Sequence, residues 1–238
     1  MKFINKIVLG TMKLKKYFNN SKDLSIFLDY AHEKGIKQIH ISSEYDSYNL
    51  IKKSLKKIKQ KKFSFILKLA EPKTDKNKFN LRRFKKKIYQ YRKDLGPSNN
   101  FTIQLVNRYQ CNNNKEYLIY QQSLFDKIKR TIVKLKKIKV INNFYFFPYH
   151  KERIKIKKRG FIDGITCYRN INEKHFDNFA KKNKFEIIAM RTFGGNNKII
   201  KKDNLKRLIQ FNLKNKIVKK VIVGINNKEQ LNQLMNVC

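Results

Sequence analysis

The chain has 238 residues, of which 41% are hydrophobic and 13% aromatic, which excludes an intrinsically disordered chain and predicts a single domain over residues 1–238. A formal net charge of +40 would favour a nucleic-acid or anionic-membrane partner, because lysines near phosphates release counterions. The lysine excess, however, accompanies abundant asparagine and isoleucine, no tryptophan and few prolines and glycines. AT-rich coding gives this bias to any protein, so we expect a basic, solvated surface without a nucleic-acid partner.

The first half of the chain alternates short β-rich runs with longer segments of helical period, which is typical of a parallel sheet covered by helices. A strand at residues 7–12 leads to a helix with Ser21 as its N-cap, and Gly35 ends that helix. Three more strands are predicted, with amphipathic helices between them, at residues 38–42, 63–70 and 101–107.

The second half continues the alternation less regularly. A basic helix is predicted at residues 124–139, and four further strands at residues 144–149, 161–168, 185–193 and 220–225. Eight strand-helix units of this length predict the α/β class and a single (β/α)8 TIM barrel, compact with short loops. The main alternative is a doubly wound open sheet, which would have fewer strands and a glycine-rich turn after the first; LGTMKL lacks GxGxxG.

The cysteines and histidines show no spacing typical of a metal site or a disulfide framework. The three cysteines form no CxxC pair, and the four histidines are not paired at ligand intervals. The apolar stretch in MKFINKIVLGTMKL is too short for a signal peptide, and no run approaches the roughly 18 apolar residues of a membrane span. We therefore expect a soluble cytoplasmic protein without a metal, as a monomer or weak dimer.

Three parts of the sequence resemble the aldo-keto reductases. KIVLGTMKL resembles the first strand of that family and the turn after it, and IHISSEYDSY resembles the strand that ends in an aspartate with a tyrosine five residues later. IIAMRTFGG followed by VIVGINNKEQL is similar to the family's seventh and eighth strands and its cofactor-phosphate loop. The order and spacing of these stretches match the family pattern over almost the whole chain, and this match is more specific than any single motif.

The resemblance implies a catalytic tetrad of Asp, Tyr, Lys and His, in which the tyrosine protonates a carbonyl oxygen while NADPH delivers hydride. Tyr45 matches the tyrosine, and Lys68 matches the lysine at the end of the third strand. A tyrosine of pKa near 10 is a poor acid at pH 7 unless a cation stabilises its phenolate, which is the task of the lysine.

The other two tetrad positions differ from the family pattern. His40 stands where the aspartate is expected, so the carboxylate is absent unless Glu44 or Asp46 replaces it. The histidine position falls on Asn107, or on Val106 if the alignment shifts by one residue. Asn107 would still donate an amide hydrogen bond to a carbonyl oxygen.

The resemblance also implies a site for NADPH or NADH. The family's Ser-Asn pair after strand five has no counterpart in FFPYHKE. The family's strand-six glutamine falls near Gly164, and the aromatic residue that stacks on the nicotinamide falls near Met190. The remaining implied contacts are Gly10, Thr11, Met12, Met190, Arg191, Gly224, Asn226, Asn227 and Gln230. The last four match the loop and helix start that receive a phosphate. The alternative is an ordinary asparagine-rich helix cap.

Three functions are compatible with these residues. The first is a diverged NADPH-dependent reductase of a small or sugar-like carbonyl, with Tyr45 as proton donor and Lys68 as its support. The second is a barrel that binds a nucleotide or sugar ligand without reduction, or performs different chemistry with His40. The third is a basic RNA-associated protein, which requires lysines gathered on one face beside exposed aromatics. Short loops predict an open substrate site, in which Tyr45 and Lys68 are not deeply buried.

Overall fold

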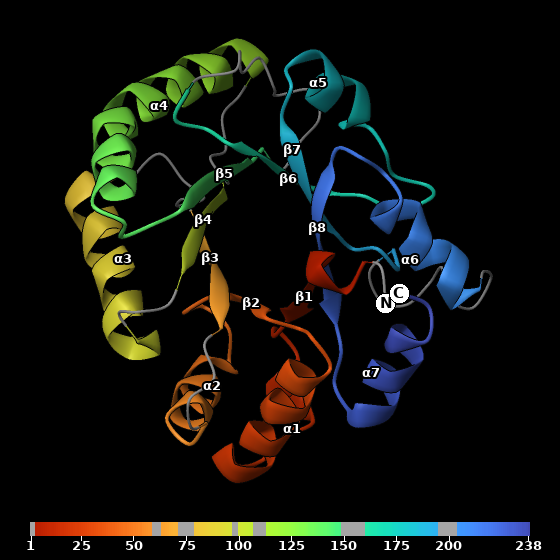
Figure 1. Ribbon diagram of the computed structural model, residues 1–238. Coiled ribbons are helices and arrows are strands. Elements are labelled where there is room, and N and C mark those ends of the chain that lie inside the picture. The colour runs from red at the N-terminus through yellow and green to blue at the C-terminus, as the bar shows by residue number, and fades with distance from the viewer. Residues whose placement is uncertain are drawn as a thin grey trace.

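The computed structural model of the protein describes residues 3–58, 63–70, 79–96, 100–106, 113–148, 160–194 and 204–238. Eight parallel strands close into a barrel in the order β1-β2-β3-β4-β5-β6-β7-β8, and helices surround it (Figure 1). The predicted TIM barrel is thereby confirmed. A doubly wound open sheet is excluded, because β1 pairs with β8 as well as with β2.

The strands lie where the sequence predicts them, although several of their ends differ. They are β1 (Ile7–Gly10), β2 (Gln38–Ile41), β3 (Ser64–Ala70), β4 (Phe101–Val106), β5 (Asn143–Phe147), β6 (Gly164–Tyr168), β7 (Glu186–Met190) and β8 (Val218–Gly224). The predicted strand at residues 161–168 begins late, at Gly164, and the one at residues 185–193 ends early, at Met190. Asn107 and Tyr149, at two predicted strand ends, lie outside the described residues.

Helices follow the strands along the chain. They are α1 (Ser21–Glu33), α2 (Tyr48–Leu55), α3 (Leu81–Leu95), α4 (Asn114–Lys137), α5 (Asp177–Lys182), α6 (Leu205–Leu213) and α7 (Lys228–Met235), with short 3-10 helices η1 (Ile4–Lys6) and η2 (Leu14–Lys16). The N-cap of α1 is Asn20 and not Ser21, because the Asn20 side chain accepts from the backbone of Lys22 and Asp23. α4 begins ten residues before the predicted helix, where Asn113 caps it.

Side chains alternate between two cores. The larger core lies between the strands and the helices, and a small one fills the barrel interior with Val8, Ile66, Tyr145 and Ile188. Polar side chains from the same inward-facing positions continue the interior, among them His40 and Gln104. The carboxyl ends of all eight strands meet at one end of the barrel, which we call the mouth.

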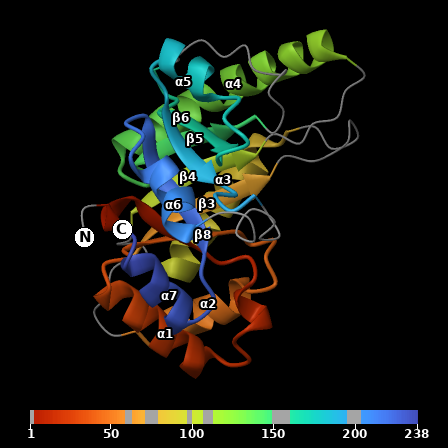
Figure 2. The same ribbon diagram turned by 90° about the vertical axis from the view of Figure 1, so that its right-hand side faces the viewer.

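The opposite end of the barrel is closed by polar contacts. The Lys6 ammonium donates to the carbonyls of Leu213 and Asn215 over 2.9 and 3.3 Å, and Lys220 donates to the Asn5 carbonyl over 2.7 Å. η1 therefore lies against the strand starts, as the side view shows (Figure 2). This arrangement leaves the mouth as the end of the barrel at which a ligand site is expected.

Gly164 is required by close packing at the start of β6. The Tyr145 hydroxyl donates to Glu186 over 2.5 Å, and this pair lies across the backbone of Gly164. A Cβ at Gly164 would lie 2.1 Å from the Glu186 carbonyl oxygen and 2.7 Å from a Tyr145 ring carbon. Neither neighbour can move without disturbing a strand.

We expect Gly164→Ala to lower the free energy of unfolding by about 3 kcal/mol, the upper end of the range for overpacking, because the clash involves backbone. Gly160→Ala is the matched control, since nothing lies within 4 Å of its Cβ position. Urea unfolding followed by circular dichroism measures both variants. Equal stability of the two would contradict this packing.

Candidate functional site

The mouth is built from polar groups on β2, β3 and β4. The His40 ring contacts Gln104 across β3, with 2.6 Å between Nε2 and Oε1, and Lys68 pairs with Gln104 in the strand register. An amide oxygen only accepts, so His40 Nε2 carries the proton. The Gln104 amide in turn points to the Met190 sulfur, 3.5 Å away on β7. A chain of polar contacts thus crosses the barrel interior just below the mouth.

His40 is a neutral imidazole at physiological pH. It is 4% exposed, and burial lowers its pKa to about 4, with the Lys68 charge lowering it further against the raising effect of the Gln104 hydrogen bond. Burial disfavours the charged form because it removes water. The position that carries a carboxylate in the resembling family therefore carries no charge here.

The structure brings Tyr45, Lys68 and His40 together. The Lys68 ammonium lies 5.1 Å from the centre of the Tyr45 ring, and the Tyr45 and His40 ring centres are 6.0 Å apart. Tyr45 and Lys68 are both half-buried, which agrees with the expectation that they are not deeply buried.

The loop that carries Tyr45 is hydrogen-bonded on one side to the segment after β1 and on the other side to α3. The buried Thr11 hydroxyl donates to the His40 carbonyl over 2.8 Å, and the Ser47 hydroxyl donates to the Thr11 carbonyl over 2.7 Å. The Ser43 amide donates to the Tyr91 hydroxyl over 2.5 Å. Thr11 thus serves to join β1 to the Tyr45 loop, while Met12 beside it is 58% exposed.

The described tetrad candidates that remain lie at the end of β4 and on the loop that carries Tyr45. Asn107 lies outside the described residues, and Val106 is fully buried at the end of β4. Glu44 and Asp46 are exposed on the loop between β2 and α2. Asp46 lines a surface hollow of about 280 Å³ at η2 and α2, whose lining does not include Tyr45.

The end of β8 forms a helix cap. The Asn227 side chain accepts from the Gln230 amide over 2.8 Å, and the Gln230 side chain accepts from the Asn226 amide over 2.9 Å. This reciprocal arrangement satisfies donors at the start of α7. Asn226, Asn227 and Gln230 therefore cap α7. Gly224, just before them, is exposed, with nothing within 4 Å of its Cβ position.

Tyr168 is the mouth residue of β6, which the sequence did not reveal. Gly164, near which the family's strand-six glutamine falls, pairs with Glu186 at the strand start, whereas Tyr168 pairs with Met190 at the strand end. The Tyr168 ring packs edge-on against Phe147, with ring centres 5.2 Å apart. The Arg191 guanidinium lies 3.7 Å from the centre of the same ring.

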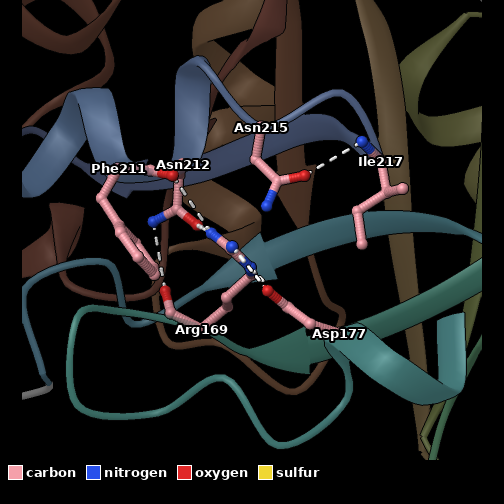
Figure 3. A network of polar contacts seen from close by, with 6 residues as sticks. All are labelled: Arg169, Asp177, Phe211, Asn212, Asn215 and Ile217. Atoms are coloured by element: carbon pink, nitrogen blue, oxygen red, sulfur yellow. Dashed lines mark hydrogen bonds and ion pairs between the residues drawn. The ribbon is translucent and has the colours of Figure 1, made fainter. Parts of the chain in front are cut away.

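A buried arginine joins the ends of β6 and β7 to α6 (Figure 3). Arg169 is 2% exposed and donates two hydrogen bonds of 2.8 Å to Asp177, and it donates a third of 2.7 Å to Asn212. The Asn212 amide returns a hydrogen bond to the Arg169 carbonyl and another to the Thr192 hydroxyl. A charge buried this deeply is tolerated because it is paired with Asp177 and hydrogen-bonded to α6.

Two absences concern only the residues that the structure describes. Among those residues, no three His, Cys, Asp or Glu side chains are grouped so that they could hold a metal ion. No helix among them is long and apolar enough to cross a membrane.

Comparison with known proteins gives a likeness of structure and none of sequence. No known family profile and no curated protein matches the chain. A putative aldo-keto reductase from Pseudomonas aeruginosa is 15% identical, with a TM-score of 0.70 over 98% of this chain and 88% of that one. An aldo-keto reductase from Klebsiella pneumoniae in complex with NADPH is 9% identical, with a TM-score of 0.69 over 98% and 84%. A glycerol dehydrogenase from Gluconobacter oxydans is 14% identical, with a TM-score of 0.66 over 98% and 86%.

These structures confirm the resemblance at the level of the fold. The chain has the barrel of the aldo-keto reductases, and it matches them along nearly its whole length.

The stability of the protein should depend on the protonation of His40. The unfolded chain takes up a proton on this residue near pH 6.5, whereas the folded chain does so only near pH 4. The free energy of unfolding should therefore fall as the pH drops through this window, by on the order of 3 kcal/mol from His40 alone. Urea unfolding between pH 7 and pH 4 measures the effect.

Two variants isolate this contribution. His40→Gln should lose less stability on acidification than the wild type, because glutamine keeps a donor for Gln104 and does not titrate. His175→Gln, at an exposed site, should retain the wild-type pH dependence. Parallel pH curves for the wild type and His40→Gln would refute a buried neutral His40.

We expect Asp177→Asn to lower the free energy of unfolding by about 3–5 kcal/mol, because it leaves the buried Arg169 charge without its carboxylate. Lys219→Met is the control: it breaks the exposed Lys219–Glu186 pair of 3.4 Å and should cost less than about 1 kcal/mol. Thermal and urea unfolding compare the two. Similar small losses in both variants would show that the Arg169 network is not a stabilising element.

Proposed function

We propose that the protein is a nicotinamide-dependent oxidoreductase of the aldo-keto reductase type, which reduces a small or sugar-like carbonyl compound. The observation that carries the proposal is the contact of Tyr45 with Lys68 at the mouth of the barrel, with a neutral His40 beside them. The fold shared with solved aldo-keto reductases supports it. In such a barrel the reacting residues project from the carboxyl ends of the strands.

In this proposal Tyr45 donates a proton to the substrate's carbonyl oxygen. The Lys68 ammonium stabilises the phenolate that remains, since a cation within about 4–6 Å favours the ionised form of an acid. His40 contributes no negative charge at this place, so the effect of Lys68 on Tyr45 is not offset by a carboxylate from β2. Tyr45 is thereby made a better proton donor near neutral pH.

The rim of the mouth between β1 and β8 fits an extended cofactor. Gly10 pairs directly with Gly224, and nothing lies within 4 Å of a Cβ position at Gly224, so a ligand can approach the backbone of β8 closely there, whereas the space beside Gly10 is filled by Ile222 and Val223 at 3.2 Å. Met190 at the end of β7 and the start of α7 would border a cofactor bound on this rim. When bound, NADPH or NADH would supply the hydride that adds to the carbonyl carbon.

The second candidate is a barrel that binds a nucleotide or sugar without reducing it. Met190 favours it, because methionine replaces the aromatic ring that would hold the nicotinamide flat. His40 favours it as well, because the tetrad carboxylate is absent. Cofactor binding without turnover would support this candidate over the first.

The test is titration with NADPH and NADH by cofactor fluorescence, followed by turnover of a panel of aldehydes and ketones. Tyr45→Phe and Lys68→Met should each lower kcat roughly a hundredfold or more, because general acid catalysis contributes at least that much. NADPH should bind both variants as it binds the wild type.

Tyr89→Phe and Lys93→Met make the same chemical changes on the exposed face of α3 and serve as controls. Heparin, added as a competitor, separates a cofactor site from adsorption to the basic surface. Carbonyl reduction that persists in Tyr45→Phe would contradict the proposal. Cofactor binding that heparin abolishes would also contradict it.

A further inference from the structure

A hollow of about 410 Å³ lies at the end of the barrel opposite the mouth, where β7 and β8 begin. It is bordered by α5 and by the turn before β8, and Ala180, Phe185 and Ile217 give it an apolar wall. Its volume lies within the range of roughly 300–1,000 Å³ that is typical of small-molecule sites. No residue of the candidate reductase site belongs to its lining, so the hollow is separate from the mouth.

Positive charge predominates in this hollow. Four exposed lysines line it, and they are Lys181, Lys184, Lys216 and Lys219. Glu186 is the one acid among the described residues of the lining, and its carboxylate already accepts from the Tyr145 hydroxyl over 2.5 Å and lies 3.4 Å from the Lys219 ammonium. The other three lysines form no ion pair with a described residue. Most of the positive charge in the hollow is therefore available to an anion.

The position of Lys219 is set by a bulge in β8. Two successive residues of β7 pair with Val218 and with Lys220, so Lys219 is an extra residue in the strand. Strict alternation along the strand would place Lys219 on the same buried face as Val221. The bulge gives that face to the fully buried Val218 and leaves the Lys219 side chain 60% exposed. Bulges at barrel rims redirect side chains in this way.

The backbone at Lys184 and Lys216 is ordered as well. Lys184 has a φ of +52°, the left-handed conformation that favours glycine, and its amide donates to the Lys181 carbonyl over 3.1 Å at the end of α5. Lys216 lies in a turn in which the Asn215 side chain accepts from the Ile217 amide over 3.1 Å (Figure 3). An ordered backbone reduces the entropy that these lysines lose when a ligand binds.

Two further cations lie close to Lys219. Burial lowers the pKa of Lys6 and of Lys220, and the charge of Lys219 lowers both further, while Glu186 acts in the opposite direction on Lys220. Both side chains are hydrogen-bonded to backbone carbonyls at the closed end of the barrel, so they stay near Lys219. An anion bound in the hollow would relieve this repulsion, because a nearby negative charge favours protonated amines.

The lining favours a chain of phosphates over a nucleic acid. Lysine binds phosphate oxygens as a point charge, and several ammonium groups around one hollow suit an anion with several negative charges. A single-stranded nucleic acid would require aromatic side chains on which its bases stack. Phe185 is the one aromatic residue of the lining, and it is 2% exposed. A diphosphate or triphosphate group requires no such surface.

We propose that the hollow between α5 and the start of β8 is a binding site for a small molecule with a diphosphate or triphosphate group. Lys184, Lys216 and Lys219 bind its phosphate oxygens. The free phosphate chain and its nucleoside ester share this chemistry. Because the site lies at the end of the barrel away from Tyr45 and Lys68, the inference does not depend on the reductase function.

The experiment is titration with tripolyphosphate, ATP and orthophosphate by calorimetry, in about 0.15 M salt to screen exposed charges. Tripolyphosphate should bind saturably, with one molecule per chain. Orthophosphate should bind roughly tenfold or more weakly, because it reaches fewer lysines. ATP that binds as tightly as tripolyphosphate would assign recognition to the phosphates alone, whereas tighter ATP binding would add a contact of the nucleoside with the apolar wall.

Substitution of the lysines locates the site. Lys216→Gln and Lys219→Gln should each weaken tripolyphosphate binding roughly tenfold, because each removes a charge-assisted hydrogen bond. Lys184→Asn should do the same, since asparagine tolerates the left-handed backbone. The variant with all three substitutions should lose tripolyphosphate binding. Thermal unfolding of each variant checks that these exposed substitutions leave the fold intact.

A second triple variant separates the hollow from the overall charge of the protein. Lys85→Gln, Lys86→Gln and Lys93→Gln together remove the same number of charges from exposed positions of α3 and should leave the affinity nearly unchanged. Equal losses in the two triple variants would overturn the inference, because binding would then follow net charge alone. Binding of many molecules per chain without saturation would overturn it too.

Two further measurements test the place and the class of the ligand. Lys68→Met should leave the affinity for tripolyphosphate unchanged, and a large loss in this variant would overturn the inference by placing the phosphates at the mouth. A short oligouridylate should bind more weakly than tripolyphosphate. If it binds more tightly, and only while Lys184, Lys216 and Lys219 are present, the hollow is a nucleic-acid site and the proposed small molecule is wrong.

Discussion

Closure of the parallel barrel is the constraint on which the rest of the structure depends. Every strand begins at one end and finishes at the other, so the final inward-facing residues of all eight strands converge on one small area. Barrel closure brings together residues that are distant in sequence. His40, Gln104 and Met190 form a connected row of contacts across the interior. The helices outside contribute mainly apolar packing.

Burial in the barrel interior sets the charge of the residues at the mouth. A histidine that is 4% exposed cannot hold a proton at pH 7 beside a lysine, and its pKa of about 4 follows from that burial. A carboxylate at the same position would form an ion pair with Lys68, whereas the neutral ring lets the lysine charge act on Tyr45. With a neutral imidazole at His40, the mouth is more positive by one charge than it would be with a carboxylate there.

The sequence was sufficient for the barrel because strand and helix periodicities alternate eight times. Strand ends were less predictable, because the aromatic residues that flank β6 and β7 favour strands equally well inside and outside the sheet. Tyr45 and Lys68 were found through short motifs. Gln104 was recognisable as an amide in an otherwise apolar strand, FTIQLV, although nothing in the sequence indicated its partner.

The Arg191–Tyr168 pair could not be read from the sequence, because it depends on two facts that only three dimensions supply. Strand register sets Tyr168, and not Gly164, beside Met190, and a left-handed backbone at Arg191 turns the side chain back towards β6. The buried network of Arg169, Asp177 and Asn212 holds both strand ends in that relation. The buried Arg169 network therefore orders the ends of β6 and β7 together with α6, and the stacked Arg191 side chain lies on that ordered framework.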